Sequence, residues 1–354
     1  MDINLFDFEL PEDRIAQFPL KHRDECKLMV IDREEKTIEH RQFHDILDYL
    51  QPGDVLVRNN TRVIPARLIG EKEETHGKVE VLLLHEIEGE KDTWECLVGN
   101  AHSVRVGTYC SFGDGRLRCR CKKVKDEGIR IMEFIYEGIF LEVLDALGQM
   151  PLPPYIKQQC EDKEDYQTVY AKIPGSAAAP TAGFHFTEEL FEKLKQKGIE
   201  VVDVTLHIGL GTFRPVKVQD TKDHVMHEER YQISKNAAER LNLAKKEGRR
   251  IIAIGTTSVR TLESVYAKYG VFVACSEATS IFISPGYEYK AVDALITNFH
   301  LPKSTLVMLV SAFMGREWTL HCYQEAIDHG YRFFSFGDSM FIHGKFDYQN
   351  NEDL

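Results

Sequence analysis

A short proline-rich segment divides this chain into two parts with different patterns of secondary structure. Pro151, Pro153 and Pro154 fall within four residues, shortly after Gly148. Because proline has a fixed φ angle and no backbone N–H to donate, this segment can form neither a helix nor a central strand. The structural unit before it therefore ends here.

The residues before this segment, from about 67 to 140, favour β structure over short stretches. Gly113, Asp114 and Gly115 are typical of a tight hairpin turn. Short strands with turn residues between them and little helical periodicity predict a small antiparallel barrel or sandwich. The expected strands are 67–70, 79–85, 94–98, 109–112, 116–124 and 129–135.

After the proline-rich segment, apolar strands alternate with helices. Thr187 is a suitable N-cap for a helix that ends by Gly198, and Gly248 follows a second helix. Near-continuous apolar strands separated by helices favour parallel pairing in an α/β sheet. The expected strands are 199–208, 250–254, 291–297 and 331–336, and the other expected helices are 234–247, 259–268, 304–314 and 318–329.

The 354 residues suffice for two domains. We expect an α/β fold class, in which a domain with a mixed or parallel sheet carries an inserted small antiparallel β-barrel domain. Residues 1–63 and 149–347 would form the discontinuous α/β domain and residues 64–148 the barrel. Residues 348–354 would be a flexible tail.

Charge, hydropathy and cysteine spacing narrow the class of protein. The 44 Lys and Arg against 56 Asp and Glu give a net charge of −12, which argues against a nucleic-acid wrapper that is basic overall but permits a local basic face. The longest apolar run, 306–314, is shorter than the roughly 20 residues that span a bilayer, and residues 1–5 lack a secretion signal. The eight cysteines include no C-x-x-C pair, and Cys119 and Cys121 would share a buried strand face. We therefore expect a cytoplasmic protein with reduced thiols and no membrane association.

Polar residues follow several of the expected strands, where open α/β sheets bind their ligands. The Gly255 segment leads into a helix N-terminus, whose free N–H groups suit a carboxylate or phosphate, although Thr257 or Ser258 can equally act as an N-cap. The polar segments are 207–212, 255–258 with Arg260, 297–300 and 336–338.

Three other segments carry ambiguous signals. Residues 177–186 are poor in bulky side chains, as expected either where backbone approaches a ligand or in a packed loop. Gly209 and Gly211 match part of a nucleotide-binding fingerprint but lack its third glycine. Residues 224–229, with two histidines and two glutamates, fit a solvated polar loop better than a metal site.

The expected strand 116–124 carries basic residues on one face: Arg116, Arg118, Arg120 and Lys122. Such a stripe fits contacts with nucleic-acid phosphates. It also fits a solvated edge strand that charge protects from aggregation.

Over nearly its whole length the chain resembles the S-adenosylmethionine:tRNA ribosyltransferase-isomerase family of queuosine biosynthesis. It departs from the family pattern at Asn60, where Asp is usual, and at Cys26 and Lys27, where Ser and Arg are usual, and we assign no role to these three residues. The matching segments are 54–67, 150–156, 166–170, 175–187, 205–216, 224–228, 255–260 and 297–305.

The resemblance implies a monomeric α/β enzyme with an inserted barrel and S-adenosylmethionine as co-substrate. The ribosyl part of that molecule would pass to the aminomethyl group of 7-aminomethyl-7-deazaguanine, at the wobble position of a tRNA with a GUN anticodon. It would be isomerised to an epoxycyclopentanediol, giving epoxyqueuosine in tRNA, adenine and methionine. The resemblance implies no metal.

This chemistry requires a base at the 5′ carbon, which the sulfonium acidifies, and a proton donor for the departing adenine. Histidine suits both tasks near neutral pH. We therefore expect catalytic roles for His185, His207 and His300, with Asp338 or Glu228 orienting them or sharing the work.

Two sets of binding residues complete the expected site. Arg260 and the Gly255 helix N-terminus would hold the methionine carboxylate. The full set expected to bind substrate is Thr181, Gly183, Gly209, Gly211, Thr212, Thr256, Thr257, Arg260 and Asn298. The set expected to hold tRNA phosphates is Arg62, Arg67, Arg116, Arg118 and Arg120.

Three alternatives make different predictions. A methyltransferase would have a glycine-rich loop after its first strand, and residues 32–35 contain no glycine. A hydrolase using His207, His224 and His227 would contain a metal. A non-catalytic RNA-binding module would use the barrel face and release no adenine.

Overall fold

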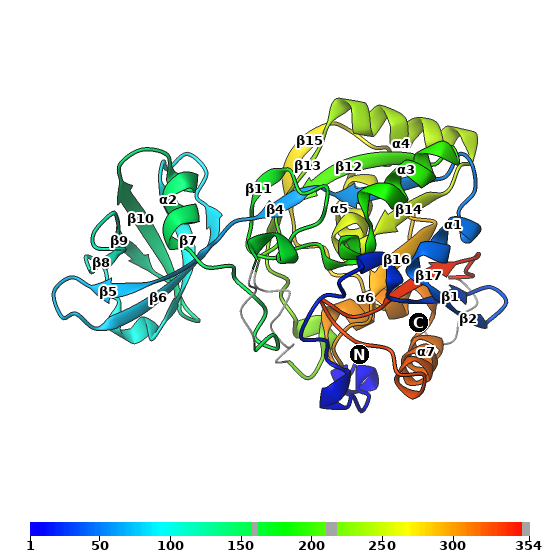
Figure 1. The fold of residues 1–354 in the computed structure, drawn as a ribbon, viewed down its shortest axis with the longest axis horizontal. Coiled ribbons are helices and arrows are strands. Elements are labelled where there is room, and N and C mark those ends of the chain that lie inside the picture. The colour runs from blue at the N-terminus through cyan, green and yellow to red at the C-terminus, as the bar shows by residue number, and fades with distance from the viewer. Residues whose placement is uncertain (158–161, 210–217, 349–354) are drawn as a thin grey trace.

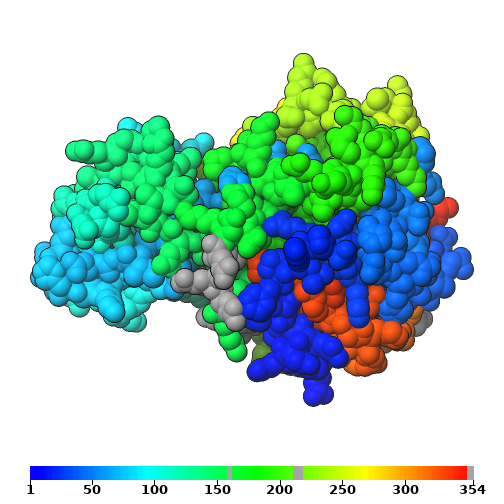
Figure 2. All heavy atoms as spheres, in the orientation of Figure 1, coloured from blue at the N-terminus to red at the C-terminus, as the bar shows by residue number. Residues whose placement is uncertain are grey.

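The computed structural model describes residues 1–157, 162–209 and 218–348. These residues form a small closed barrel and a larger α/β body (Figure 1), which Figure 2 shows as two lobes of unequal size. A two-stranded parallel sheet, β4 (Thr61–Val63) with β11 (Ile173–Ser176), lies where the chain leaves the body for the barrel. Gly211, Thr212 and the expected tail, apart from Tyr348, lie outside the described residues.

The barrel consists of six antiparallel strands, and all six expected strands are confirmed. The hairpin turn at 113–115 joins two of them. Leu117, Cys119 and Cys121 are buried inside, whereas Arg118 and Arg120 face outward. In barrel order the strands are β10 (Ile129–Tyr136), β7 (Thr93–Gly99), β6 (Lys78–Glu86), β5 (Arg67–Lys72), β8 (Tyr109–Phe112) and β9 (Leu117–Val124), followed in the chain by helix α2 (Phe140–Leu147).

The body is built on a nine-stranded mixed sheet, so the predicted fold class is confirmed. Its central strands β12, β3, β14 and β16 are parallel, and so are β17 and β1, while the other neighbours are antiparallel. In sheet order the strands are β15 (Cys275–Thr279), β13 (Glu229–Ile233), β12 (Glu200–Leu206), β3 (Val55–Asn59), β14 (Ile251–Ile254), β16 (Ala294–Asn298), β17 (Ser339–His343), β1 (Lys27–Asp32) and β2 (Thr37–Gln42).

Helices cover both faces of this sheet because successive strand residues point to opposite faces. In β14, Ile251 and Ala253 pack in the core that includes α4, α5, α6 and α7, whereas Ile252 and Ile254 pack in the core that includes α1 and α3. The helices are α1 (Ile46–Tyr49), α3 (Glu188–Gln196), α4 (Lys235–Glu247), α5 (Gly255–Tyr269), α6 (Thr305–Met314) and α7 (Arg316–Asp328).

Two local predictions were wrong. Residues 331–336 form no strand beyond one isolated bridge at Phe333; their aromatic side chains are buried by packing, and Phe334 has a φ of +73°, which interrupts an extended chain. The strand lies at β17 instead. The segment 255–258 is the first turn of α5 because Gly255, at φ +82°, lets the chain pass from β14 into the helix without a loop.

The described cysteines are free thiols, and all of them except Cys275 are buried. None of the helices in the described part of the chain is long and apolar enough to cross a membrane.

Candidate functional site

Polar residues from distant parts of the chain meet at one edge of the large sheet. Because β3, β12, β14 and β16 are parallel, their carboxyl ends lie at the same edge. Strand β17 runs antiparallel to β16, so Asp338, at its start, lies there too. The polar segments expected from the sequence therefore converge, as far as the described residues extend.

Two adjoining cavities open at this edge. A pocket of about 80 Å³ is lined by five of the expected residues, namely Thr181, Thr256, Thr257, Asn298 and His300. A cavity of about 870 Å³ lies between the body and the barrel and is lined by His207, Gly209 and Glu228 from the body and by His85, Glu86 and Trp94 from the barrel. Ile208 lines the small pocket while its neighbours line the large one, so the two are separated by a single segment. We call them the small pocket and the junction cavity.

His207 lines the junction cavity with its ring against the backbone of Gly175. A Cβ atom at Gly175 would lie 3.0–3.2 Å from three ring atoms, so glycine leaves room for the ring. Nδ1 of His207 lies 2.8 Å from the Thr61 hydroxyl, and that hydroxyl donates to the Ile173 carbonyl at 3.4 Å. In the tautomer that leaves Nε2 with its lone pair, Nδ1–H donates to Thr61 while the Thr61 hydroxyl donates to the Ile173 carbonyl. Burial lowers the pKa of His207, so the ring is neutral at pH 7.

His300 lines the small pocket. Its Nε2 lies 3.0 Å from the hydroxyl of Thr297, and its backbone N–H donates to the Tyr323 hydroxyl at 3.1 Å. Burial lowers the pKa of His300 to about 3. This ring is therefore a neutral hydrogen-bonding group at physiological pH.

His185 lies behind the small pocket, between Cys26 and Asn298. The amide nitrogen of Asn298 donates to the carbonyls of Phe334 and Ser335, so its oxygen faces His185 Nε2 at 2.9 Å and accepts from it. His185 Nδ1 is then the acceptor for the Cys26 thiol, 3.1 Å away. Burial lowers the pKa of His185 to about 4 and raises that of the Cys26 thiol well above its ordinary value, so both groups are neutral.

This arrangement makes His185 a positioning residue for Asn298. His185 contacts the small pocket through that amide, and itself borders only a crevice of about 20 Å³. Cys26, to which the sequence assigned no role, supplies the second anchor of the ring.

Glu229 belongs to the segment 224–229, whose sequence favours a solvated polar loop. That interpretation is wrong at Glu229, which begins β13 and is buried. Its carboxylate is buried and forms an ion pair with Arg260 Nη1, and its Oε1 accepts from the Gly209 N–H at 3.0 Å. Arg260 therefore has a protein partner, where the sequence predicted a substrate carboxylate. Nε and Nη2 of Arg260 are buried without a hydrogen-bond partner among the described residues.

Asn59 is a residue that the sequence did not identify as part of the site. Its side-chain nitrogen donates to the Leu206 carbonyl at 2.9 Å and to the Thr257 hydroxyl at 3.2 Å, and its oxygen accepts from the N–H groups of Thr61 and Leu206. It thereby joins the ends of β3 and β12 to the start of α5. The available signal was a polar residue shortly after the apolar run 55–57. Asn60, beside it, accepts from the Thr205 hydroxyl at 2.7 Å.

Three expected site residues have other neighbours. Asp338 is buried and accepts from the N–H groups of Lys27 and Arg332, at 3.0 and 2.7 Å, and from the Arg332 guanidinium, so it joins β1 to β17. It has no hydrogen bond to a histidine among the described residues, but its negative charge acts on His185 against the lowering of that pKa by burial. Glu228 is exposed at the rim of the junction cavity. A Cβ atom at Gly183 would lie 1.9 Å from the Tyr170 hydroxyl, so packing within the protein accounts for that glycine.

The arginines expected to bind tRNA fall into two groups. Arg62, Arg67 and Arg118 form ion pairs with Glu164, Glu80 and Glu73, respectively. Arg116 and Arg120 are exposed on the barrel with no carboxylate partner among the described residues. Exposed ion pairs contribute little to stability, so a phosphate can replace the carboxylates in the first group.

The histidines of the alternative hydrolase are not assembled into a metal site. His207, His224 and His227 do not belong to any group, among the described residues, whose three donor atoms lie within 4.8 Å of one another. His224 instead packs edge-on against Phe282, with ring centroids 5.5 Å apart.

Two comparisons with known proteins identify the family. A crystal structure of an S-adenosylmethionine tRNA ribosyltransferase from Thermotoga maritima, at 2.00 Å resolution, is similar to this chain, with 37% sequence identity and a TM-score of 0.55. The similarity covers 96% of this chain and 99% of the other. A family model described as queuosine biosynthesis protein matches residues 3–342. The chain therefore belongs to the family of queuosine biosynthesis proteins.

Proposed function

We propose that this protein transfers the ribosyl part of S-adenosylmethionine to the aminomethyl group of 7-aminomethyl-7-deazaguanine in tRNA and isomerises it to an epoxycyclopentanediol. The products are epoxyqueuosine in tRNA, adenine and methionine. The tRNA carries a GUN anticodon. The observation that carries this proposal is His207, whose ring is held by Thr61 through Nδ1 at the wall of a cavity that both the barrel and the body line. With the proton on Nδ1, Nε2 is free to act as a base.

The sizes of the two cavities indicate which part of the substrates each cavity binds. Small-molecule sites typically measure about 300–1,000 Å³, so the junction cavity can admit S-adenosylmethionine beside an extruded nucleotide, and the small pocket cannot. The small pocket has room for one substituent, and its threonine hydroxyls and Asn298 suit the edge of a heterocyclic base. We assign it to the adenine.

His207 acts as the general base in this proposal. Its Nε2 takes a proton from the 5′ carbon, which the adjacent sulfonium acidifies, and the ring becomes an imidazolium. The departing adenine needs a proton, and this imidazolium supplies it. His300 remains neutral and donates a hydrogen bond to the adenine, because its low pKa disfavours a cationic acid.

Arg260 and the barrel arginines bind the charged ends of the substrates. The unpartnered Nε and Nη2 of Arg260 suit the methionine carboxylate, while Nη1 stays paired with Glu229. Arg116 and Arg120 contact tRNA phosphates, and Arg62, Arg67 and Arg118 exchange their carboxylate partners for phosphates.

The remaining properties follow from the same assignment. The protein works as a monomer in the cytoplasm, and ribosyl transfer requires no metal. Residues 1–63 and 149–347 form the catalytic domain, and residues 64–148 form the inserted barrel domain that holds the tRNA. Sedimentation at the enzyme concentrations used for turnover tests whether the protein is a monomer, and a stable dimer would contradict this.

The decisive experiment supplies purified protein with S-adenosylmethionine and tRNA that carries the 7-aminomethyl-7-deazaguanine base, in the presence of a chelator. Adenine and methionine should appear in equal amounts, together with modified tRNA. Unmodified tRNA serves as the control and should give neither product. Methyl transfer without adenine release would contradict the proposal, and tight RNA binding without turnover would favour a binding module.

A further inference from the structure

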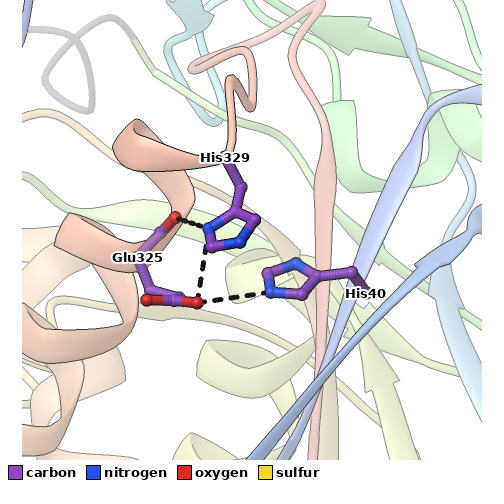
Figure 3. Close-up of side chains that lie close together, drawn as sticks. All are labelled: His40, Glu325 and His329. Carbon is purple, nitrogen blue, oxygen red and sulfur yellow. Dashed lines mark hydrogen bonds and ion pairs between the residues drawn. The ribbon is translucent and has the colours of Figure 1, made fainter.

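A cluster of two histidines and one glutamate lies outside the two cavities of the candidate site. His40 comes from β2, and Glu325 and His329 come from the last turn of α7 and the residue after its end (Figure 3). Within the described residues this is the one group of three such side chains whose donor atoms all lie within 4.8 Å of one another. None of the three lines the junction cavity or the small pocket.

The distances in this cluster match a tetrahedral metal site. Glu325 Oε1 lies 3.5 Å from His40 Nε2 and 3.3 Å from His329 Nδ1. Zinc binds nitrogen and oxygen ligands at about 2.0–2.1 Å, so two ligands at the tetrahedral angle lie about 3.3–3.4 Å apart. Both histidine nitrogens thus lie near the separation from the shared carboxylate oxygen that coordination requires. His329 Nδ1 also lies 2.9 Å from the backbone carbonyl of Glu325 and donates to it, so coordination through Nδ1 requires this hydrogen bond to break and the proton to leave.

The surroundings of the cluster support the ligand arrangement. His40 Nδ1 lies 2.9 Å from the hydroxyl of Tyr331, so the ring is held with Nε2 toward Glu325. Such an outer hydrogen bond fixes the tautomer of a metal-binding histidine. The side chains of His40, Glu325 and His329 are 35%, 31% and 49% exposed, which leaves space for a water as fourth ligand.

The charged and dipolar groups around the cluster have opposing effects on a bound cation. The carboxylate and the carbonyl end of α7 favour a cation. Lys27 opposes it, since its ammonium donates to the carbonyls of His329 and Gly330 at 2.6 and 3.2 Å. With no bound cation, the two rings stack with centroids 4.3 Å apart, and a protonated histidine would pair with Glu325.

From this geometry we propose that His40, Glu325 and His329 bind a divalent transition-metal ion, with Zn²⁺ preferred for two imidazoles and one carboxylate. Because β2 is an edge strand of the sheet, the ion would tie this edge to α7. Its role is structural. Ribosyl transfer does not depend on it, since the cluster contributes no residue to either cavity.

The test is a calorimetric titration of metal-free full-length protein with Zn²⁺ alone, supported by the absorption spectrum with Co²⁺. One equivalent should bind, and Co²⁺ should give a tetrahedral spectrum without a thiolate charge-transfer band. Removal of a ligand by His40→Ala or Glu325→Gln should weaken binding by roughly 100-fold, and Tyr331→Phe by roughly 10-fold. Lys27→Gln should strengthen it.

The chain offers a matched control. His76 lies 3.1 Å from Glu71 on the barrel, a single exposed histidine–carboxylate pair without a second histidine. His76→Ala should leave the Zn²⁺ affinity unchanged. Absence of Zn²⁺ binding, or binding that both His40→Ala and Glu325→Gln leave intact in variants with native circular dichroism, would overturn the proposal. A thiolate band with Co²⁺ would place the ion at a cysteine and overturn it as well.

Discussion

Glu229 and Arg260 form an ion pair in which the two side chains are only 4% and 6% exposed. Glu229 begins β13 and Arg260 lies in the second turn of α5, so the pair joins the edge region of the sheet to the helix that starts at the site. The second carboxylate oxygen accepts from the Gly209 N–H. One buried carboxylate therefore positions both the arginine and the backbone that follows His207.

Breaking this pair should cost far more than breaking an exposed one. Glu229→Gln leaves the Arg260 charge buried without compensation, so the free energy of unfolding should fall by about 3–5 kcal/mol. Glu229→Gln combined with Arg260→Met removes both charges and should recover most of the loss. Denaturant unfolding measures these differences.

The exposed pair between Arg62 and Glu164 provides the comparison. Its side chains are 37% and 60% exposed, so Glu164→Gln should change the unfolding free energy by no more than about 1 kcal/mol. Equal effects of Glu229→Gln and Glu164→Gln on the unfolding free energy would show that burial does not determine how much the Glu229–Arg260 pair contributes to stability.

The three histidines of the site should differ in their effects on the chemical step. His207→Gln should lower single-turnover adenine release by roughly 100-fold or more, with substrate binding and thermal stability nearly unchanged, since its Nε2 is the proposed base. His300→Gln should have a smaller effect because it retains a donor beside the adenine. His185→Gln should act mainly through stability, because this residue is buried behind Asn298.

The variant Thr61→Val tests how much the orientation of the His207 ring contributes to the rate, apart from its role as a base. It keeps the ring but removes the hydroxyl that accepts from Nδ1–H, so the rate should fall by less than in His207→Gln. Burial lowers the pKa of His207, so the decline of the wild-type rate in acid should have its midpoint below pH 6.5. Normal turnover in His207→Gln would refute the assignment of the base.

The burial of His185 predicts a loss of stability in acid. Its pKa is about 4 in the folded protein and near 6.5 in the unfolded chain, so only the unfolded chain takes up a proton between these values. The contribution is complete above pH 6.5 and is lost as pH falls toward 4, by about 3 kcal/mol in total.

Unfolding free energies measured from pH 7.5 to 4.5 test this behaviour. The wild type should lose stability toward acid more steeply than His185→Gln, by about one proton. His300 adds a similar dependence in both proteins, since its pKa is lowered to about 3. Parallel pH profiles for the two proteins would mean that His185 is protonated in the folded state.

Much of the architecture could be predicted because its signals are local. Alternation of Leu117, Cys119 and Cys121 with basic residues specified a barrel strand, and Ser234 and Gly248 marked the ends of α4. The aromatic-rich segment 331–336 gave a wrong strand prediction, since buried aromatic residues pack equally well outside a strand. The segment that forms a strand here is β17, which pairs with β1 and β16, both far away in the sequence.

The sequence was enough to place the polar segments of the candidate site at one sheet edge, but not to predict the contacts between them. Strand ends pointed to the edge where His207 and His300 lie, because the carboxyl ends of parallel strands meet. The contact between His185 and Cys26 joins residues 159 positions apart, and that between Arg260 and Glu229 depends on how β13 packs beside α5. Such long-range partners leave no pattern in the chain.

The basic stripe on the barrel should account for much of the salt dependence of tRNA binding. Changing Arg116, Arg118 and Arg120 together to Gln should weaken binding and flatten the slope of affinity against salt, because fewer counterions are released. Arg118 already has a partner: its Nη2 donates to the Glu73 carboxylate at 2.8 Å. The variant with only Arg116 and Arg120 changed should therefore show most of the effect. Glu73→Gln, which frees Arg118, should tighten binding at low salt. Filter binding across a salt series measures all four proteins, and an unchanged affinity and slope in the triple variant would assign the stripe to protection of the barrel surface.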